Sequence, residues 1–161
     1  SKASPMVKAV PGIGYPEIYE VMEGEAHYLL QSRFLDDVVL ISAGAGDLVI
    51  IPPGYGHVTL NPLPDTTLVM ANIVSTAFES EYEVYEQYQG GAYYEMSEGD
   101  LVKNPRYPRV PPVRFLGATC TGKLHPLCKG PLYSFIGNRE MLTFLNFPEK
   151  YLTIFSVLLK K

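Results

Sequence analysis

"GDLVIIPPGYGHVTLN", residues 46–61, is the stretch that decides the fold. An apolar run ends at a double proline, and a glycine-rich turn then leads into a second run that begins at His57. Gly46 permits a tight turn before the first run, and Pro52 ends a strand where no further backbone donor is needed. The stretch therefore predicts two short strands joined by a turn, with His57 just beyond that turn.

The sequence around this stretch repeats the same kind of pattern from Glu17 to about Val74. Short apolar or alternating runs, separated by turn residues such as Gly, Pro and Asp, predict strands. These runs read "EIYEVMEG", "EAHYLLQS", "DDVVLISA" and "TTLVMANIVS". Strands at such even spacing indicate a sandwich or a small barrel, so we expect an all-β domain.

The pattern changes over residues 78–112, which are acidic and tyrosine-rich and then proline-rich. We expect an irregular segment here, with a short helix over 80–88 and a strand near 92–96. The four prolines that follow disfavour regular structure, because proline lacks a backbone N–H and restricts the residue before it. They predict an extended stretch.

The C-terminal part is expected to be helical. Asn138 is a suitable N-cap for a helix that ends near Asn146, and Pro148 suits the first turn of a second helix. Two terminal lysines are favourable at the C-terminal end of that second helix. We therefore predict a barrel domain over residues 1–116 and a loop and helical extension over residues 117–161.

The composition limits the class of protein. The chain has 161 residues, a formal net charge of −4 and no basic cluster, which argues against nucleic acid or an anionic membrane as a main partner. No apolar run is long enough to cross a bilayer and no signal-peptide pattern opens the chain, so we expect a cytoplasmic protein. Two cysteines are too few for a disulfide framework.

Two motifs with fixed residue spacing contain a carboxylate and an imidazole that are candidates for one shared site. The opening stretch places five residues between Gly46 and Pro52, four between Pro52 and His57, and three between His57 and Asn61. This spacing resembles the second motif of the cupin barrels. Six residues separate Glu17 from Gly24, as in the tail of the first cupin motif. The resemblance implies that Glu17 and His57 share one inward-facing metal site.

Each of these residues also has a simpler interpretation. A histidine after a turn is more often a loop residue than a ligand, and Glu17 lies in a region with several other glutamates that can face solvent. His27 alternates away from the position of Glu17, so we expect a structural role for it. The group Cys120, His125 and Cys128 resembles metal-ligand spacing only loosely, and an ordinary loop with reduced thiols is the more frequent case.

Three longer phrases resemble the cupin-type glucose-6-phosphate isomerases, which are found mainly in archaea. They read "YPEIYEVMEGEAHYLLQ", "GDLVIIPPGYGHVTLNP" and "YEVYEQYQGGAYYE", and the ending "GPLYSFIGNREMLTFLNFPEKY" resembles the tail of longer family members. The resemblance implies a cupin barrel, that is a double-stranded β-helix or jelly roll, in a homodimer. It also implies one divalent transition metal, which is iron, nickel, zinc or manganese according to the member.

In that family the metal is held by a His-x-His pair, a glutamate and a later histidine. Glu17 and His57 match the last two, but no histidine precedes His27 in this chain. A metal held by one carboxylate and one imidazole would be weakly bound and mostly hydrated. Few residues precede Glu17, so we expect an N-terminally short barrel whose exposed sheet edge must be covered or paired.

The resemblance implies an aldose–ketose isomerase that interconverts glucose 6-phosphate and fructose 6-phosphate. Glu17 would act as ligand or base, and Tyr19, on the same side of the strand, would orient a hydroxyl or relay a proton. Tyr82 resembles a family tyrosine that lines the substrate pocket, and Tyr85 and Tyr93 are weaker substrate-binding candidates. Two alternatives remain open: a catalytically impaired cupin that binds a sugar phosphate or serves as a structural or regulatory subunit, and a different cupin activity such as an epimerase or dioxygenase.

Overall fold

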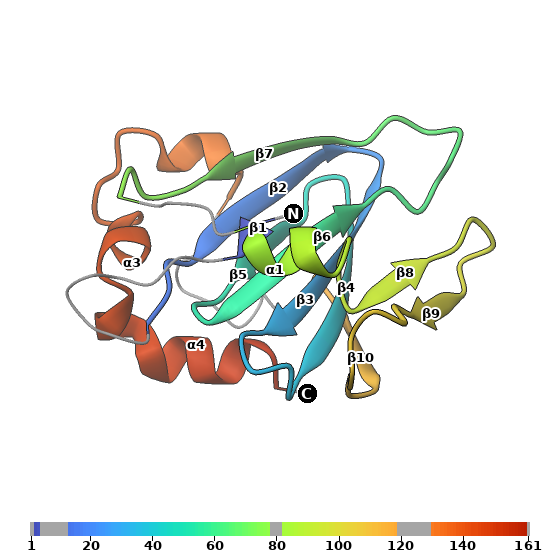
Figure 1. Cartoon of the computed structure of the whole chain (residues 1–161). Coiled ribbons are helices and arrows are strands. Elements are labelled where there is room, and N and C mark those ends of the chain that lie inside the picture. Colours follow the sequence, from blue (N-terminus) through green and yellow to red (C-terminus); the bar gives the residue numbers. More distant parts are fainter. Residues whose placement is uncertain (1, 4–12, 78–81, 119–129, 161) are drawn as a thin grey trace.

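The computed structural model describes residues 2–3, 13–77, 82–118 and 130–160. It is an all-β domain of the jelly-roll, cupin type with short helices towards the C-terminus (Figure 1), which confirms the expected fold class. The larger sheet has the order β1 (Lys2–Ala3), β6 (Tyr55–Leu60), β3 (Glu25–Ser32), β4 (Val38–Gly44), β10 (Val113–Gly117). The smaller sheet has the order β5 (Leu48–Ile51), β2 (Glu17–Glu23), β7 (Val69–Ile73).

Alternation along the strands decides which side chains fill the barrel. In β3, Tyr28 and Leu30 belong to the main core cluster, whereas Leu29 belongs to a second cluster on the other face of the sheet. Leu30 lies opposite His57 of β6, so the same alternation turns His57 towards the barrel interior. In the smaller sheet, Glu17 lies opposite Ile51. The pairing register therefore determines which side chains of these strands face the barrel interior and which face outwards.

The predicted strands are present, but one begins earlier than expected, and the strands Lys2–Ala3, Leu101–Lys103 and Val113–Gly117 were not predicted. Strand β6 begins at Tyr55, so His57 lies inside the strand and not just beyond the turn, because pairing with β3 extends back to the Ser32–Tyr55 pair. Strand β10 was not predicted and pairs in parallel with β4. The outer edge of β6 is covered by β1, which pairs with it in antiparallel fashion. This short strand covers the edge of β6 at Gly56 and His57 only.

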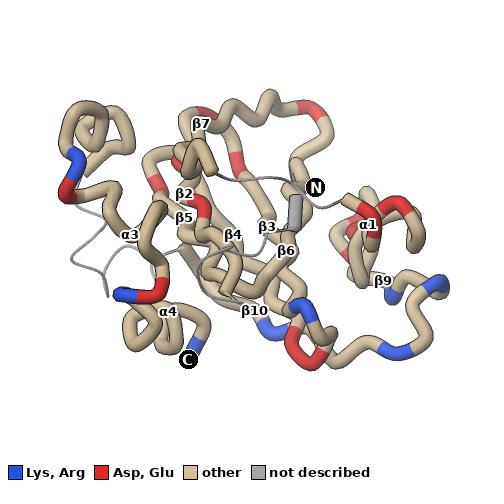
Figure 2. The backbone as a smooth tube through the Cα atoms, turned by 60° about the vertical axis from the view of Figure 1, so that its left-hand side comes forward, with Lys and Arg blue, Asp and Glu red and all other residues tan. Residues whose placement is uncertain are grey.

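A hairpin and one short helix follow the barrel strands. Strands β8 (Tyr93–Glu95) and β9 (Leu101–Lys103) form the hairpin, and its Tyr93 packs in the second cluster with Leu29 of β3. The helix is α1 (Glu83–Gln87), which falls within the predicted range. Figure 2 shows the acidic residues of α1 and the basic residues on and after β9. Tyr85 is the one buried residue of α1.

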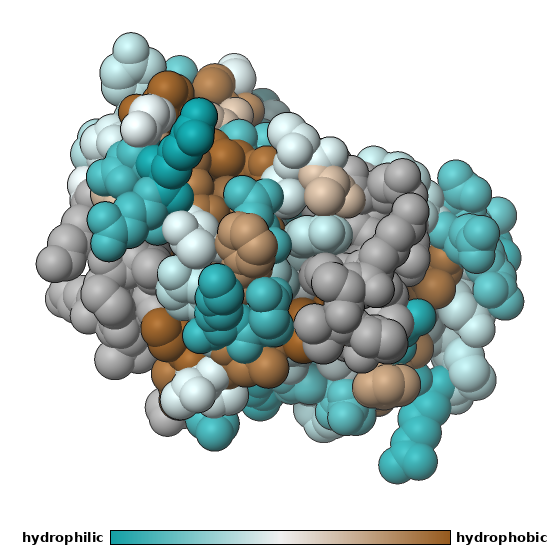
Figure 3. Space-filling view, turned by 90° about the vertical axis from the view of Figure 1, so that its left-hand side faces the viewer, coloured by the Kyte–Doolittle hydropathy of each residue, from teal (hydrophilic) through white to brown (hydrophobic). Residues whose placement is uncertain are grey.

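The C-terminal segment packs against the smaller sheet. It contains η1 (Leu132–Phe135), α3 (Thr143–Asn146), η2 (Pro148–Tyr151) and α4 (Leu152–Leu158). The backbone N–H of Leu132 donates to Oε2 of Glu20 over 2.8 Å, and Phe135 and Phe144 are fully buried in the main core. On the face shown in Figure 3, hydrophobic residues lie beside hydrophilic ones. The boundary between residues 1–116 and 117–161 stays a prediction.

The predicted helix ends in this segment are correct at Asn146 and Pro148, but the first helix begins later than expected. Oδ1 of Asn138 accepts from the backbone N–H of Met141 at 3.3 Å. Asn138 therefore caps a turn, and α3 itself begins at Thr143. Among the described residues, no helix has the length and apolar character needed to cross a membrane.

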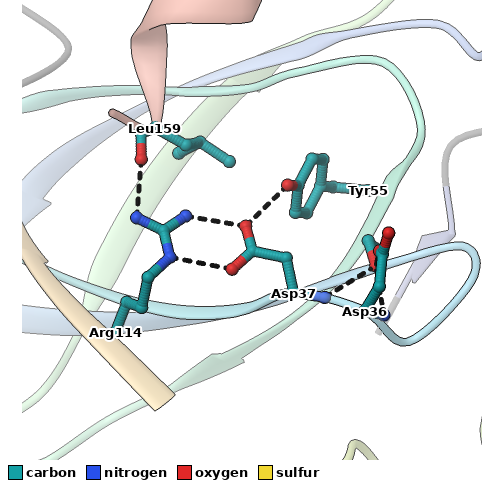
Figure 4. A network of polar contacts seen from close by, with 6 residues as sticks. Asp36, Asp37, Tyr55, Arg114 and Leu159 are labelled. Atoms are coloured by element: carbon teal, nitrogen blue, oxygen red, sulfur yellow. Dashed lines mark hydrogen bonds and ion pairs between the residues drawn. The ribbon is translucent and has the colours of Figure 1, made fainter. Parts of the chain in front are cut away.

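A polar latch at the barrel rim joins the C-terminal helix to the strands (Figure 4). Arg114 of β10 donates from Nε to Oδ1 of Asp37 over 2.8 Å and from Nη2 to Oδ2 over 2.7 Å. Its Nη1 donates to the carbonyl oxygen of Leu159 at 2.7 Å, and the hydroxyl of Tyr55 donates to Oδ2 of Asp37 at 2.7 Å. The rim latch, defined by these four residues, fixes the end of α4 to β6, to β10 and to the start of β4.

Candidate active site

Three side chains that the sequence singled out meet inside the barrel. Strand β2 carries Glu17 and Tyr19, two residues apart and hence on one face, and β6 of the other sheet carries His57. The hydroxyl of Tyr19 donates to Oε2 of Glu17 at 2.9 Å and lies 3.1 Å from Nε2 of His57. Nδ1 of His57 is 3.8 Å from Oε1 of Glu17. We call Glu17, Tyr19 and His57 the inner cluster.

The inner cluster is almost completely removed from solvent. Glu17 is 0% exposed, His57 is 2% exposed and Tyr19 is 7% exposed. Burial is the main cause that raises the pKa of Tyr19 above its ordinary value of 10.0, and the adjacent Glu17 carboxylate adds to the shift. Tyr19 therefore stays protonated and acts as a hydrogen-bond donor to Glu17. The hydroxyl of Tyr19 has one proton, which it donates to Glu17. The hydrogen in the contact between Tyr19 and His57 is therefore carried by Nε2 of His57.

Aromatic packing holds this geometry. The ring centroids of Tyr19 and His57 are 5.2 Å apart in an edge-to-face arrangement, and Tyr28 lies 5.3 Å from Tyr19. The hydroxyl of Tyr28 donates to Sδ of Met70 at 3.3 Å, and burial raises the pKa of Tyr28. Rings fixed on several sides restrict the rotamers of the cluster. The arrangement is thus preorganised for polar chemistry in a site of low dielectric constant.

The described residues do not complete a metal site. They contain no group of three or more His, Cys, Asp or Glu side chains arranged to hold an ion. Glu17 and His57 offer one carboxylate and one imidazole, which are suitable donors for a divalent transition metal but too few to define its geometry. The group Cys120, His125 and Cys128 lies outside the described residues.

The other candidate residues lie apart from the inner cluster. His27 is on the opposite face of β3 from Leu30, and its Nδ1 is 2.7 Å from Oε1 of Glu95. Tyr93 packs in the second core cluster, where its hydroxyl donates to the carbonyl oxygen of Pro111 at 2.7 Å. Tyr82 is 40% exposed at the start of α1. The structure therefore brings Glu17, Tyr19 and His57 together, but not Tyr82 or Tyr93 with them.

A cavity of about 440 Å³ beside the rim latch is a competing location for a ligand. It is lined by Asp37, Arg114, Phe155 and Lys160 among others, and neither Glu17 nor His57 belongs to its lining. Each nitrogen of Arg114 already donates one hydrogen bond, to Asp37 or to the backbone of Leu159. Since the chemistry-bearing side chains converge in the barrel, we place the candidate site there.

One residue near the inner cluster received only minor weight from the sequence. Tyr85 is 5% exposed, and its hydroxyl has no hydrogen-bond partner among the described residues. A one-turn helix in an acidic, tyrosine-rich segment gives no periodicity that distinguishes its buried side from its exposed side. Tyr85, Tyr82 and Tyr88 are therefore indistinguishable without the tertiary structure.

A comparison with models of protein families finds a match over residues 7–111. Its description is "Glucose-6-phosphate isomerase (GPI)". The matched part is about two thirds of the chain and includes the whole inner cluster. No curated protein matches the chain.

Proposed function

The chain belongs to the glucose-6-phosphate isomerase family, and from this premise we propose that it interconverts glucose 6-phosphate and fructose 6-phosphate at the inner cluster. The observation that carries the proposal is the convergence of Glu17, Tyr19 and His57 from two sheets into one buried group. Buried ionisable groups are costly, so their convergence in a barrel interior is typical of a functional site.

The reaction moves one hydrogen between C1 and C2 of the open-chain sugar. In the proposed path, the Glu17 carboxylate removes the proton from C2 of glucose 6-phosphate. The electron pair forms a C1–C2 double bond while the C1 carbonyl electrons move to O1, which gives an enediolate. The proton of the O2 hydroxyl is transferred to O1, and Glu17 returns its proton to C1 to give fructose 6-phosphate. Glu17 ends the cycle as it began, as a general base should.

The neighbours of Glu17 support this role. The hydroxyl of Tyr19 holds Oε2, so Oε1 is the oxygen on the side of Nδ1 of His57. A raised pKa keeps Tyr19 protonated, and we propose that it relays the proton between O1 and O2 or donates to the oxygen where negative charge develops. Such donors act strongly in a site that excludes water.

Metal dependence is a separate part of the proposal. A divalent metal in this family would act as a Lewis acid at the sugar oxygens, and Glu17 and His57 are the residues that would hold it. Because the described residues supply only these two ligands, the proton-transfer steps are assigned to the chain's own side chains.

A second candidate function is favoured by the same small ligand set. A cupin that binds a sugar phosphate without turnover, or that serves as a structural or regulatory subunit, would keep the barrel and the inner cluster without a complete metal site. Catalysis and binding therefore need to be measured separately on the same protein.

The test is a coupled assay that measures conversion of fructose 6-phosphate to glucose 6-phosphate by the purified chain. It is run with chelator and then with added Fe²⁺, Ni²⁺, Zn²⁺ or Mn²⁺. We expect Glu17→Gln to lower kcat by about 100-fold or more, the range for loss of a general base, and His57→Ala to do the same. Glu23→Gln, an exposed glutamate of the same strand, is the matched control.

Ordinary activity in Glu17→Gln or in His57→Ala would reject the inner cluster as the active site. A wild-type chain that binds fructose 6-phosphate in calorimetry but does not convert it, with every metal tested, would favour the second candidate function.

A further inference from the structure

The hydroxyl of Tyr85 is a buried hydrogen-bonding group without a partner among the described residues. The side chain is 5% exposed, and it is the single buried residue of α1. A buried phenol normally finds an acceptor, because leaving the group unsatisfied loses the hydrogen bond that water would provide. An unpartnered hydroxyl of this kind next to a candidate active site needs an explanation.

The segment that carries Tyr85 is held firmly against the barrel. The carbonyl oxygen of Tyr85 accepts from the backbone N–H of Gly90 at 2.8 Å. The carbonyl oxygen of Gly90 in turn accepts from the hydroxyl of Tyr107 at 3.0 Å. Oε1 of Gln31 in β3 accepts from the backbone N–H of Ala92 at 2.9 Å. These contacts connect the segment that follows Tyr85 to Gln31 of β3, which lies opposite Gly56 of β6, the residue before His57.

A second anchor acts on the same segment. Nδ2 of Asn104, a residue that is 1% exposed, donates to the carbonyl oxygens of Tyr88 and Gly91, each at 2.9 Å. These bonds fix the chain just after α1. The unpartnered hydroxyl of Tyr85 is thus not the result of a loosely placed helix.

The Glu17 carboxylate is part of the electrostatic environment of the Tyr85 hydroxyl. Burial is the largest cause that raises the pKa of Tyr85, and both Tyr107 and the Glu17 carboxylate are close enough to raise it further. Tyr85 is therefore protonated at physiological pH, and its hydroxyl can donate to an acceptor that a bound ligand supplies. The acceptors of a sugar phosphate are hydroxyl, carbonyl and phosphate oxygens.

We propose that Tyr85 is a ligand-binding residue of this site, whose hydroxyl donates a hydrogen bond to an oxygen of the sugar phosphate bound beside Glu17. This inference rests on the proposed function for the class of ligand. It assigns to Tyr85 the substrate contact that the sequence suggested first for Tyr82 and also for Tyr93. Their environments differ: Tyr82 is exposed, and the hydroxyl of Tyr93 is already bonded to Pro111.

Tyr85→Phe tests the inference because it removes the hydroxyl and leaves the ring. We expect the KM for fructose 6-phosphate to rise roughly three- to tenfold, the effect of losing one neutral hydrogen bond, with kcat changed less than about twofold. The melting temperature should stay the same or rise, since the change breaks no hydrogen bond among the described residues. This combination would not result from a merely structural role.

Tyr55→Phe is the matched control. It removes a hydroxyl that is bonded to Asp37 in the rim latch, so it should lower the melting temperature and leave the KM unchanged. An unchanged KM in Tyr85→Phe, as expected if the hydroxyl serves only an internal water, overturns the inference while the proposed function stands.

The two proposals fail in different ways. If the wild type binds fructose 6-phosphate without turning it over, and Tyr85→Phe weakens that binding by the same factor, the isomerase proposal fails and the inference survives. If the wild type binds neither fructose 6-phosphate nor glucose 6-phosphate, the inference is overturned together with the function. If Tyr85→Phe raises the KM but binds inorganic phosphate as tightly as wild type, the contact is with a sugar oxygen and not with the phosphate group.

Discussion

The inner cluster and the rim latch contain similar chemistry but have different consequences. Each combines a carboxylate, a tyrosine hydroxyl and a nitrogen-containing side chain, with contacts of 2.7–3.8 Å. The latch is partly exposed, at 35% for the Arg114 side chain and 24% for Asp37, and it joins segments that are distant in the chain. The inner cluster is buried and lies in a core that apolar side chains already hold together.

This difference teaches how to separate structural from functional polar groups. The latch has a clear structural purpose, because it fixes the end of α4 to three strands. The inner cluster adds little stability to compensate for the free-energy cost of burying a carboxylate, so its presence indicates function. We therefore expect changes in the latch to affect stability and changes in the inner cluster to affect activity. The following predictions test that division.

The largest effect in the latch is expected for Arg114→Met. The change removes the charged donors of Asp37 and Leu159, and it should lower the free energy of unfolding by about 2 kcal/mol, less than for a fully buried pair because water can solvate Asp37. Urea unfolding measures this value. Arg109→Met, at an exposed arginine, is the control and should stay within about 0.5 kcal/mol of wild type.

The kcat and KM of Arg114→Met for fructose 6-phosphate should stay within about twofold of wild type. A loss of activity without a loss of stability would break the division between the two regions and would assign the cavity beside the latch to the site.

A smaller effect is expected from acid. The hydrogen bonds from Arg114 are the main cause that lowers the pKa of Asp37 below its ordinary value of 3.8. Because the pKa is lower in the folded than in the unfolded state, the latch contributes its full stability above about pH 4 and loses it as the pH falls towards the lowered folded value. The melting temperature of wild type should therefore fall more steeply below pH 4 than that of Arg114→Met. Parallel curves for the two proteins would contradict this assignment.

The smallest effect is expected for Tyr55→Phe, which removes one hydrogen bond to Asp37. We expect a loss of about 1 kcal/mol, towards the low end for a bond to a charged acceptor, because the arginine contacts remain. Additivity with Arg114→Met should fail, since both residues share Asp37. A double-mutant cycle in urea measures the coupling, and a zero coupling energy would show that the two contacts act independently.

Much of the fold follows from local patterns. Alternation and turn residues predicted the strands that became β2 to β7, because a strand with one buried face needs a period of two whatever it packs against. Strand β10 was missed: it follows a proline-rich stretch and becomes a strand through its parallel pairing with β4. The late start of α3 was also missed, since Asn138 can cap a turn or a helix with the same bond.

Spacing was sufficient to predict that Glu17 and His57 meet in the barrel with Tyr19 on the same face as Glu17, and their role as an active site stays a prediction. Spacing was insufficient for the tyrosines of residues 82–93, where no repeating pattern tells one ring from the next. It was also insufficient for the latch, because Asp37 and Arg114 are 77 residues apart.

The sequence by itself determined the all-β class, the family and the pair of strands that carry Glu17 and His57. Those features depend on residue type and short-range spacing, which the linear chain contains. The tertiary structure alone decided that Tyr85, and not Tyr82, is buried near Glu17, and that Arg114 binds the end of α4. Burial and ion pairing depend on which surfaces meet after folding, and such contacts are set by the packing of the whole chain.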